Sequence, residues 1–312
     1  MTTKPGEPEM QTGRSVAGRC RGREEGFALA AAVLLLVLVS GFLLDAALRA
    51  RTERRVAWNT SVEVRARTAA RGGLAHALVR LRALQARTAA GGGDEAALFA
   101  AWNRIDEIGR ELGVVELPGG GRYQVTVHDP AALLPLNEAT ANELSRLFRA
   151  LGAGEETART AALSIVDRRE RVGPFAAPEE VREVDGAAGL PREAERYLTV
   201  LGDGRVNLNT ASAAVLGAVP GMTDEAVRMI LSRRASGGLW RNLFELEAGL
   251  TPPARLELQS RFAELSRRAG FEPVVVEVVV EGTVEHGTVR TRLRGAGVRA
   301  GASVQVVTTV EE

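Results

Sequence analysis

Cysteine is almost missing from this sequence of 312 residues. The single cysteine, Cys20, stands close to the amino terminus, so the remainder of the chain can form neither a disulfide nor a thiolate metal site. Stability must therefore come from packing. The chain is long enough to bury a substantial core, which we expect to be divided between two domains.

Catalytic motifs are also missing. Histidine occurs three times, never with a second histidine or a cysteine at metal-ligand spacing: His76, His128 and His286. No serine stands in a nucleophile elbow, and the glycine run 91–93 lacks the lysine of a phosphate-binding loop. The sequence therefore predicts that the protein is not an enzyme.

The chain has little excess of either charge sign, because 40 Lys and Arg face 39 Asp and Glu, for a net charge of +1. Nonspecific binding to nucleic acid relies on a surplus of Lys and Arg that neutralises phosphates. The near-neutral balance argues against binding of that kind.

An apolar run without charge is present near the amino terminus, from Phe27 to Leu44. Its length of about 18 residues is close to the roughly 20 that a helix needs to cross a bilayer core. The polar stretch before it is longer than the basic region of an ordinary secretory signal. Three interpretations follow: a signal cut after the run near Ala47, an uncut anchor, and a leader cut before the run.

The junction between Gly26 and Phe27 favours a leader cut before the run. It resembles the processing site of type IV prepilins and pseudopilins, whose peptidase cuts after the glycine and methylates the new terminal phenylalanine. The resemblance implies cleavage between Gly26 and Phe27, with Phe27 methylated.

The fifth position after that junction is Ala31. Most pilins and pseudopilins carry a glutamate there, and its carboxylate pairs with the terminal ammonium of a neighbouring subunit, because a lone charge in lipid costs several kcal/mol. Its absence is typical of the minor pseudopilin protein K of type II secretion. A tip subunit has no subunit above it to neutralise, so the resemblance makes Ala31 the marker of a tip subunit.

Beyond the apolar run, a stretch rich in alanine and arginine and free of proline predicts a helix from Ala46 to about Ala89. We expect this helix to be interrupted or softened at Gly72-Gly73. A solvated linker helix is the alternative. A short helix over 94–112 is expected to follow.

Runs of β-favouring residues predict five strands in two groups. The first two flank a turn at 118–121 and form a hairpin, and nothing strand-like follows until residue 273. The expected strands are 114–117, 123–127, 274–281, 283–293 and 303–310. A sheet begun before residue 130 and completed after residue 273 must hold the residues between as an insertion.

That insertion, about residues 129–270, is predicted to be helical and duplicated. Its copies open with Leu136-Asn137 and Leu208-Asn209, each followed by hydroxyl residues that can cap a helix. In the first copy, Thr140 and Glu143 have the spacing of a capping box. An arginine pair, a glycine turn and a hydrophobic-acidic stretch then follow in each copy: Arg168-Arg169, Gly173-Pro174-Phe175 and Glu179-Glu180-Val181, then Arg233-Arg234, Gly238-Leu239-Trp240 and Phe244-Glu245-Leu246.

Residues 206–234 resemble a helix-hairpin-helix, a motif that binds DNA phosphates through the backbone NH groups of its hairpin. The membrane-anchored DNA receptor of bacterial competence has the same pattern after one amino-terminal span, and is the rival interpretation. However, Thr223 replaces the second hairpin glycine, and Asp224 and Glu225 would repel a phosphate. We therefore expect no nucleic-acid partner.

The leader junction, Ala31, the split sheet and the repeated helices together resemble protein K over nearly the whole mature chain. The resemblance implies an α+β fold, in which a long amino-terminal helix packs on a small antiparallel sheet. A large all-α domain of duplicated helix-hairpin-helix-like units is inserted between the strands. The expected divisions are a prepilin leader (1–26), the transmembrane part of the helix (27–45), the periplasmic helix and first strands (46–128), the inserted helical domain (129–270) and the final strands (271–312).

The resemblance also implies a role as a minor pseudopilin of type II secretion. Such a subunit joins other minor pseudopilins in a tip complex that initiates and caps the periplasmic pseudopilus for protein export across the outer membrane. A prepilin peptidase processes it, and one span anchors it in the bacterial inner membrane with its bulk in the periplasm. Contact with secreted substrates, and a minor pilin of a related type IV pilus, stay open.

No cofactor is expected to be required. Relatives of protein K can bind calcium in the inserted domain, where Asp185 or Asp203 could contribute. No oxygen-rich spacing in the sequence fixes such a site, so the ligands stay unknown.

Overall fold

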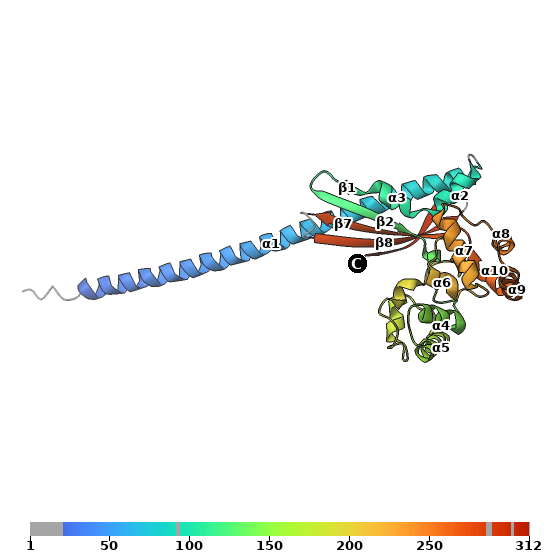
Figure 1. Cartoon of the computed structure of the whole chain (residues 1–312). Helices are drawn as coiled ribbons and strands as arrows, with labels where there is room; N and C mark the ends of the chain where they lie inside the picture. Colours follow the sequence, from blue (N-terminus) through green and yellow to red (C-terminus); the bar gives the residue numbers. More distant parts are fainter. Residues whose placement is uncertain (1–20, 92–93, 285–288, 301–302, 312) are drawn as a thin grey trace, which may run out of the picture. The chain divides into compact units, whose positions relative to one another are not determined.

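The computed structural model of the chain describes residues 21–91, 94–284, 289–300 and 303–311. Cys20, His286 and the glycines at 92 and 93 lie outside these residues. The chain divides into two compact units, Met1–Ser61 and Val62–Glu312. One long helix, α1 (Arg21–Ala89), contributes to both units (Figure 1).

Within the second unit, α1 places one stripe of small apolar side chains on a sheet. The buried members of the stripe are Val62, Ala66, Ala69, Ala70, Ala77, Leu81 and Leu84. Their spacing puts them on one face of the helix, and the alanines let its backbone approach the strands closely. The helix ends at Ala89, as predicted.

The expectation of a softened helix at Gly72-Gly73 is wrong, because α1 continues through both residues. A Cβ on Gly73 would stand 2.6 Å from Cγ1 of Val280 and 2.7 Å from Cδ2 of Tyr123. Glycine at this position therefore lets the helix lie against the sheet, and it does not interrupt the helix.

The sheet has five antiparallel strands in the order β1-β2-β7-β8-β9. Their bounds are β1 (Val114–Glu116), β2 (Gly121–His128), β7 (Val275–Val284), β8 (Val289–Ala300) and β9 (Ser303–Glu311). The hairpin of β1 and β2 confirms the predicted one. β2 pairs with β7 along its whole length, from Gly121 opposite Val284 to His128 opposite Glu277.

The predicted strand break between residues 281 and 283 is wrong, because β7 runs through Gly282. Gly282 lies opposite Tyr123, where α1 crosses the sheet. A Cβ there would come within 2.1 Å of the carbonyl oxygen of Ala66. This glycine, like Gly73, is required by the close contact between helix and sheet.

The single helix expected over 94–112 is instead two helices, α2 (Glu95–Asn103) and α3 (Asp106–Leu112). Trp102 and Ile105, on either side of the start of the break, are both buried in the core of the sheet. α3 then lies close to β2, because Gly109 would bring a Cβ within 2.8 Å of the carbonyl oxygen of Val125.

Most of the remaining helices lie in sequence between β2 and β7 and surround a second core (Figure 1). They are α4 (Ala141–Ala150), α5 (Glu155–Val172), α6 (Ala213–Ala218), α7 (Asp224–Ala235), α8 (Leu243–Ala248), α9 (Pro252–Ser260) and α10 (Phe262–Arg268). Short 3-10 helices are η1 (Pro130–Ala132), η2 (Pro178–Glu183) and η3 (Ala194–Tyr197). The predicted α+β class is confirmed.

The helical region is not entirely free of strands, which corrects the all-α prediction. Two parallel ladders of two residues each occur, β3 (Leu134–Pro135) with β4 (Leu198–Thr199) and β5 (Val206–Asn207) with β6 (Ala269–Gly270). Their partners are distant in sequence, so no local pattern of β-favouring residues marks them.

Candidate functional site

The amino-terminal part of α1 carries the residues predicted to be processed. Phe27 is 77% exposed, and every described side chain from Phe27 to Ser61 is exposed within its unit. Among the described residues, α1 is the one helix whose length and composition suit a membrane span, with a mean hydropathy of 2.8 over its most apolar window. Gly26 lies within the same helix, and Ala31 stands one helical turn beyond Phe27 on the same face.

Asn137 and Asn209 each close one copy of the duplicated unit with the same pair of hydrogen bonds. Oδ1 of Asn137 accepts from the backbone N–H of Phe175 at 2.8 Å, and Nδ2 donates to the carbonyl of Phe175 at 3.0 Å. Asn209 makes the same two bonds to Trp240, both at 2.8 Å. The asparagine thus ties the opening of each copy to its glycine turn, which confirms the predicted duplication.

The guanidinium of the first arginine in each pair lies over the aromatic ring of the glycine turn and forms an ion pair with a glutamate. The guanidinium of Arg168 lies 4.1 Å from the ring centroid of the turn residue and 2.7 Å from Glu180. In the second copy, Arg233 lies 4.3 Å from the corresponding ring and 3.1 Å from Glu245. The acidic stretch of each copy therefore pairs with the arginine that stacks on the turn.

The second arginine of each pair holds carbonyl groups at the opening motif. Arg169 donates to the carbonyls of Leu136 and Ala139, both at 2.9 Å. Arg234 donates to the carbonyl of Thr210 at 3.2 Å, and burial lowers the pKa of its guanidinium. These bonds give partners to backbone carbonyls of the loop that precedes each helix.

Replacing Asn209 with alanine is expected to lower the free energy of unfolding by about 3 kcal/mol, because three buried backbone groups lose their partner. Besides Trp240, Asn209 donates to the carbonyl of Phe271 at 2.9 Å, and its side chain is buried. Asn137→Ala is expected to cost about 1–2 kcal/mol, since Asn137 is half-buried and makes two bonds. Urea unfolding followed by circular dichroism measures both.

The control for this pair is Asn142→Ala, because Asn142 is exposed on α4. It is expected to change stability by less than about 0.5 kcal/mol. If the three variants were equally stable, the asparagine closures would have no energetic role.

The hairpin of the second copy is covered by neighbouring helices. Gly221 and Met222 are buried, and a Cβ on Gly221 would stand 3.2 Å from Cβ of Arg261. Thr223 caps α7 by accepting from the backbone N–H of Ala226 at 3.1 Å. A phosphate would have to displace this packing to reach the hairpin, which argues against the DNA-receptor interpretation.

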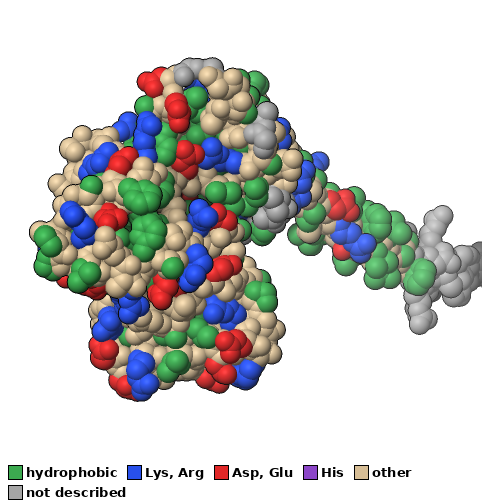
Figure 2. All heavy atoms as spheres, turned by 90° about the vertical axis from the view of Figure 1, so that its right-hand side faces the viewer, with side chains coloured by type: hydrophobic (Ala, Val, Ile, Leu, Met, Phe, Trp, Pro, Cys, Tyr) green, Lys and Arg blue, Asp and Glu red, His purple; other side chains and the backbone are tan. Residues whose placement is uncertain are grey.

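Charge at this hairpin argues in the same direction. Glu225 accepts from both the backbone and the hydroxyl of Thr251, at 2.7 and 2.6 Å, and these bonds lower the pKa of its carboxyl. Asp224 beside it is exposed. Figure 2 shows basic and acidic side chains interspersed over the face it displays, without a continuous basic band.

Asp129 joins the end of β2 to the second copy of the duplicated unit. Its carboxylate accepts from Oγ1 of Thr210 at 2.6 Å, from Nδ2 of Asn207 at 2.8 Å and from the backbone N–H of Ala131 at 2.9 Å. Burial raises the pKa of Asp129 in spite of these bonds. Asn207 also donates to Oδ1 of Asn103 at 3.0 Å, so the network spans the two cores.

The two residues considered for calcium do not gather further ligands. Asp185 and Asp203 are exposed, and Asp203 accepts from the backbone N–H of Arg205 at 3.2 Å within its own turn. In the part of the chain that the structure describes, no group of three or more His, Cys, Asp or Glu is placed to hold a metal ion.

Residues 206–261, from β5 to the end of α9, match the sequence model of the family described as "Type II secretion system (T2SS), protein K". This segment of the chain is therefore similar to the protein K family. The matched segment contains Asn209, the covered hairpin and the turn at Trp240. None of the curated proteins matches the sequence.

Among solved structures, a chain of the crystal structure of the GspK-GspI-GspJ complex from the type 2 secretion system of enterotoxigenic Escherichia coli is similar to this chain. The identity is 17%, the TM-score is 0.47, and the alignment covers 64% of this chain and 82% of that chain. A likeness this distant supports no conclusion about the role of the chain, and the match to the protein K family is confined to residues 206–261.

Sequence reasoning missed the polar residues that join separate elements of this chain. Asp129 precedes a proline, which predicts a helix cap and no buried network. Glu143 was predicted as a capping-box residue, and it does cap α4, but it also binds Arg268. No sequence signal connects residues so far apart.

Proposed function

We propose that this protein is a minor pseudopilin of the type II secretion system and belongs to the tip complex that initiates and caps the periplasmic pseudopilus. The match of residues 206–261 to the protein K family is the observation that carries the proposal. The fold agrees with it, since one long helix with an exposed apolar end precedes a small antiparallel sheet. The role is structural and involves no catalysis.

The amino-terminal helix supplies the anchor in this proposal. The apolar part of α1 from Phe27 to Leu44 makes one span of the bacterial inner membrane, and the unit from Val62 onward lies in the periplasm. A prepilin peptidase cuts between Gly26 and Phe27, and other minor pseudopilins are the partners. The role requires no cofactor, and calcium in the helical region is left open.

A tip position is supported by Ala31. A glutamate at that position would have no ammonium above it to pair with, and an unpaired carboxyl in an apolar setting costs free energy even when it takes up a proton. We therefore propose that this protein stands above every other subunit of the filament.

The test is antibody labelling of overproduced pseudopili that contain an epitope-tagged version of this protein. Label confined to one end of each filament is the expected result, and label along the shaft would overturn the tip role. Ala31→Glu is expected to leave secretion unchanged or reduced. A variant that secretes more than the wild type would contradict the interpretation of Ala31.

The competence DNA receptor is the weaker candidate. Its hairpin would need free backbone N–H groups and nearby basic side chains. Here the hairpin at Gly221 is buried and the next residues are Asp224 and Glu225.

A further inference from the structure

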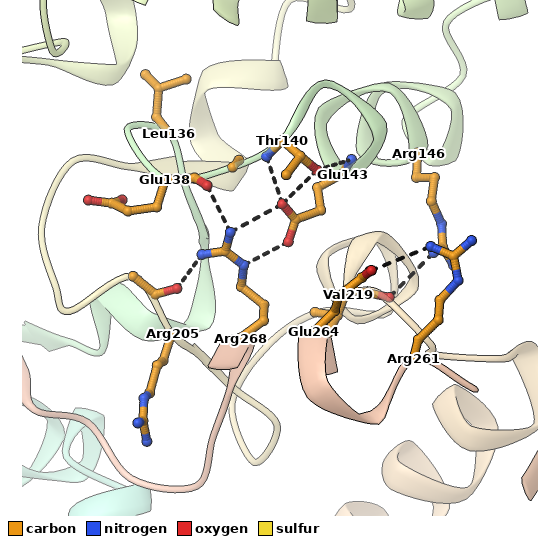
Figure 3. A network of polar contacts seen from close by, with 12 residues as sticks. Leu136, Glu138, Thr140, Glu143, Arg146, Arg205, Val219, Arg261, Glu264 and Arg268 are labelled. Atoms are coloured by element: carbon orange, nitrogen blue, oxygen red, sulfur yellow. Dashed lines mark hydrogen bonds and ion pairs between the residues drawn. The ribbon is translucent and has the colours of Figure 1, made fainter. Parts of the chain in front are cut away.

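A cleft of about 630 Å³ lies where the two copies of the duplicated unit meet α10. Its wall is formed by α4 of the first copy, the turn at 203–204, the hairpin at 218–220 of the second copy and α10 (Figure 3). Its volume is in the range of pockets that bind ligands. Neither the membrane segment nor the proposed tip role accounts for it.

One arginine that lines the cleft already binds a carboxylate and two carbonyls of the protein. Nε of Arg268 donates to Glu143 at 2.7 Å, and its Nη2 donates to the same carboxylate at 3.1 Å. Arg268 also donates to the carbonyls of Glu138 and Gly204. The two charged side chains are only 13% and 3% exposed, so this pair is a fixed wall of the cleft.

A second arginine, Arg146, has no carboxylate partner among the described residues. It donates to the carbonyls of Val219 and Met222, at 3.4 and 3.1 Å. Burial lowers the pKa of its guanidinium, and the positive charge of Arg261 lowers that pKa further. Figure 3 shows the guanidinium ends of Arg146 and Arg261 at the same corner of the cleft.

Two like charges held at one corner favour an anion between them, since a guanidinium binds a carboxylate through two parallel hydrogen bonds. Arg261 is available for such a ligand. It is exposed, and its ion pair with Glu264 is long, at 3.6 Å. Arg267 is exposed on α10 and also lines the cleft.

The remaining acidic residues of the cleft decide which anion fits. Glu138, Asp203 and Glu264 are exposed and line the same cleft. They would repel a continuous polyanion such as DNA. A peptide that carries both signs of charge would meet complementary groups, with its carboxylate at the arginines and its basic side chains at the rim.

We propose that this cleft binds an extended peptide segment of a partner protein, with a carboxylate of the segment between Arg146 and Arg261 and its flanking basic side chains beside Glu138 and Glu264. The cleft is expected to prefer a peptide that carries both signs of charge over one that carries a single sign. This preference does not depend on where the subunit stands in the filament.

Fluorescence anisotropy with the full-length protein in detergent micelles tests the site. The probe is a fluorescein-labelled octapeptide of alternating glutamate and lysine, and the control peptide has glutamine in place of glutamate. The expected result is saturable binding of the first peptide and at least tenfold weaker binding of the second. Equal binding of the two peptides would overturn the proposal.

Substitutions in the protein test whether the peptide binds at the corner formed by the two arginines. Arg261→Gln is expected to weaken the affinity for the glutamate-lysine peptide at least tenfold, because it removes one side of the carboxylate site without touching the carbonyl contacts of Arg146. Arg228→Gln is the matched control, since Arg228 is exposed on α7 and does not line the cleft. It should change the affinity less than twofold. Equal losses in both variants would show nonspecific attraction and overturn the proposal.

Competition distinguishes a peptide from a nucleic acid. An unlabelled duplex oligonucleotide is expected to displace the probe only at concentrations far above those of the unlabelled peptide. Displacement by DNA at the lower concentration would overturn the mixed-charge site and favour a phosphate ligand.

Discussion

Gly26→Leu is expected to abolish cleavage completely, so that the purified protein keeps the residues before Phe27. The wild-type protein is expected to begin at Phe27 with a methylated amino group. The reason is the resemblance of Gly26-Phe27 to a prepilin junction, in which the peptidase accepts a residue without a side chain before the cut. Mass spectrometry of the amino terminus of the membrane-bound protein measures the outcome directly.

The same helix offers a matched control for this experiment. Gly41 lies farther along α1, and a Cβ there would meet no atom within 4 Å. Gly41→Leu should therefore be cut normally and remain in the membrane. A wild-type protein that begins after Ala47 would contradict the pseudopilin processing, and so would cleavage of Gly26→Leu at Phe27.

Gly282→Ala is expected to lower the free energy of unfolding by about 3 kcal/mol, at the upper end of the usual cost of overpacking. A Cβ on Gly282 would stand 2.1 Å from the carbonyl oxygen of Ala66 and 2.6 Å from the backbone nitrogen of Ala70. Both atoms belong to the backbone of α1, so no side chain can rotate away. The helix would have to move off the sheet, and its alanine stripe would lose contact with the strands.

The control for this substitution lies on the neighbouring strand. Gly121 is two residues from Tyr123, which pairs with Gly282. A Cβ on Gly121 would stand 3.7 Å from Cβ of Ala69, an ordinary contact. Gly121→Ala should therefore change stability by less than about 1 kcal/mol. Chemical unfolding of the two variants side by side measures the difference, and equal midpoints would show that the helix does not approach the sheet as closely as described.

Several features of the fold could be predicted because they depend on residues close together in the sequence. The uninterrupted run from Phe27 to Leu44 predicts a helix that can span a membrane, and the structure places it in α1. The hairpin was found from two valine-rich runs around a proline and glycines. The capping box of Thr140 and Glu143 was found from its spacing, and the structure contains both of its hydrogen bonds.

The glycines were the main errors of the sequence analysis. Gly72-Gly73 and Gly282 were interpreted as breaks, because glycine weakens helices and strands on its own. Gly73 and Gly282 instead lie where α1 meets the sheet, and each is needed because a neighbouring element fills the space of a Cβ. The sequence around a glycine does not distinguish these two uses.

For the candidate site, too, some features could be predicted from the sequence and others could not. Gly26, Phe27 and Ala31 stay predictions from the sequence, since they depend on a peptidase and on neighbouring subunits. The repeated asparagines were recognised as openings of two copies, but their bonds to Phe175 and Trp240 emerged only from the folded chain.

The sequence by itself determined the apolar amino-terminal run, the helix that continues it, the hairpin and the duplication, because each is a pattern of period, cap or repeat within a short segment. The tertiary structure alone decided the buried network of Asp129, the pairing of Arg268 with Glu143 and the corner shared by Arg146 and Arg261. These contacts join residues far apart in the chain. Packing of the helices and strands brings them together. Burial then strengthens the interactions between their charges and hydrogen-bonding groups, and no pattern within a short segment predicts this effect.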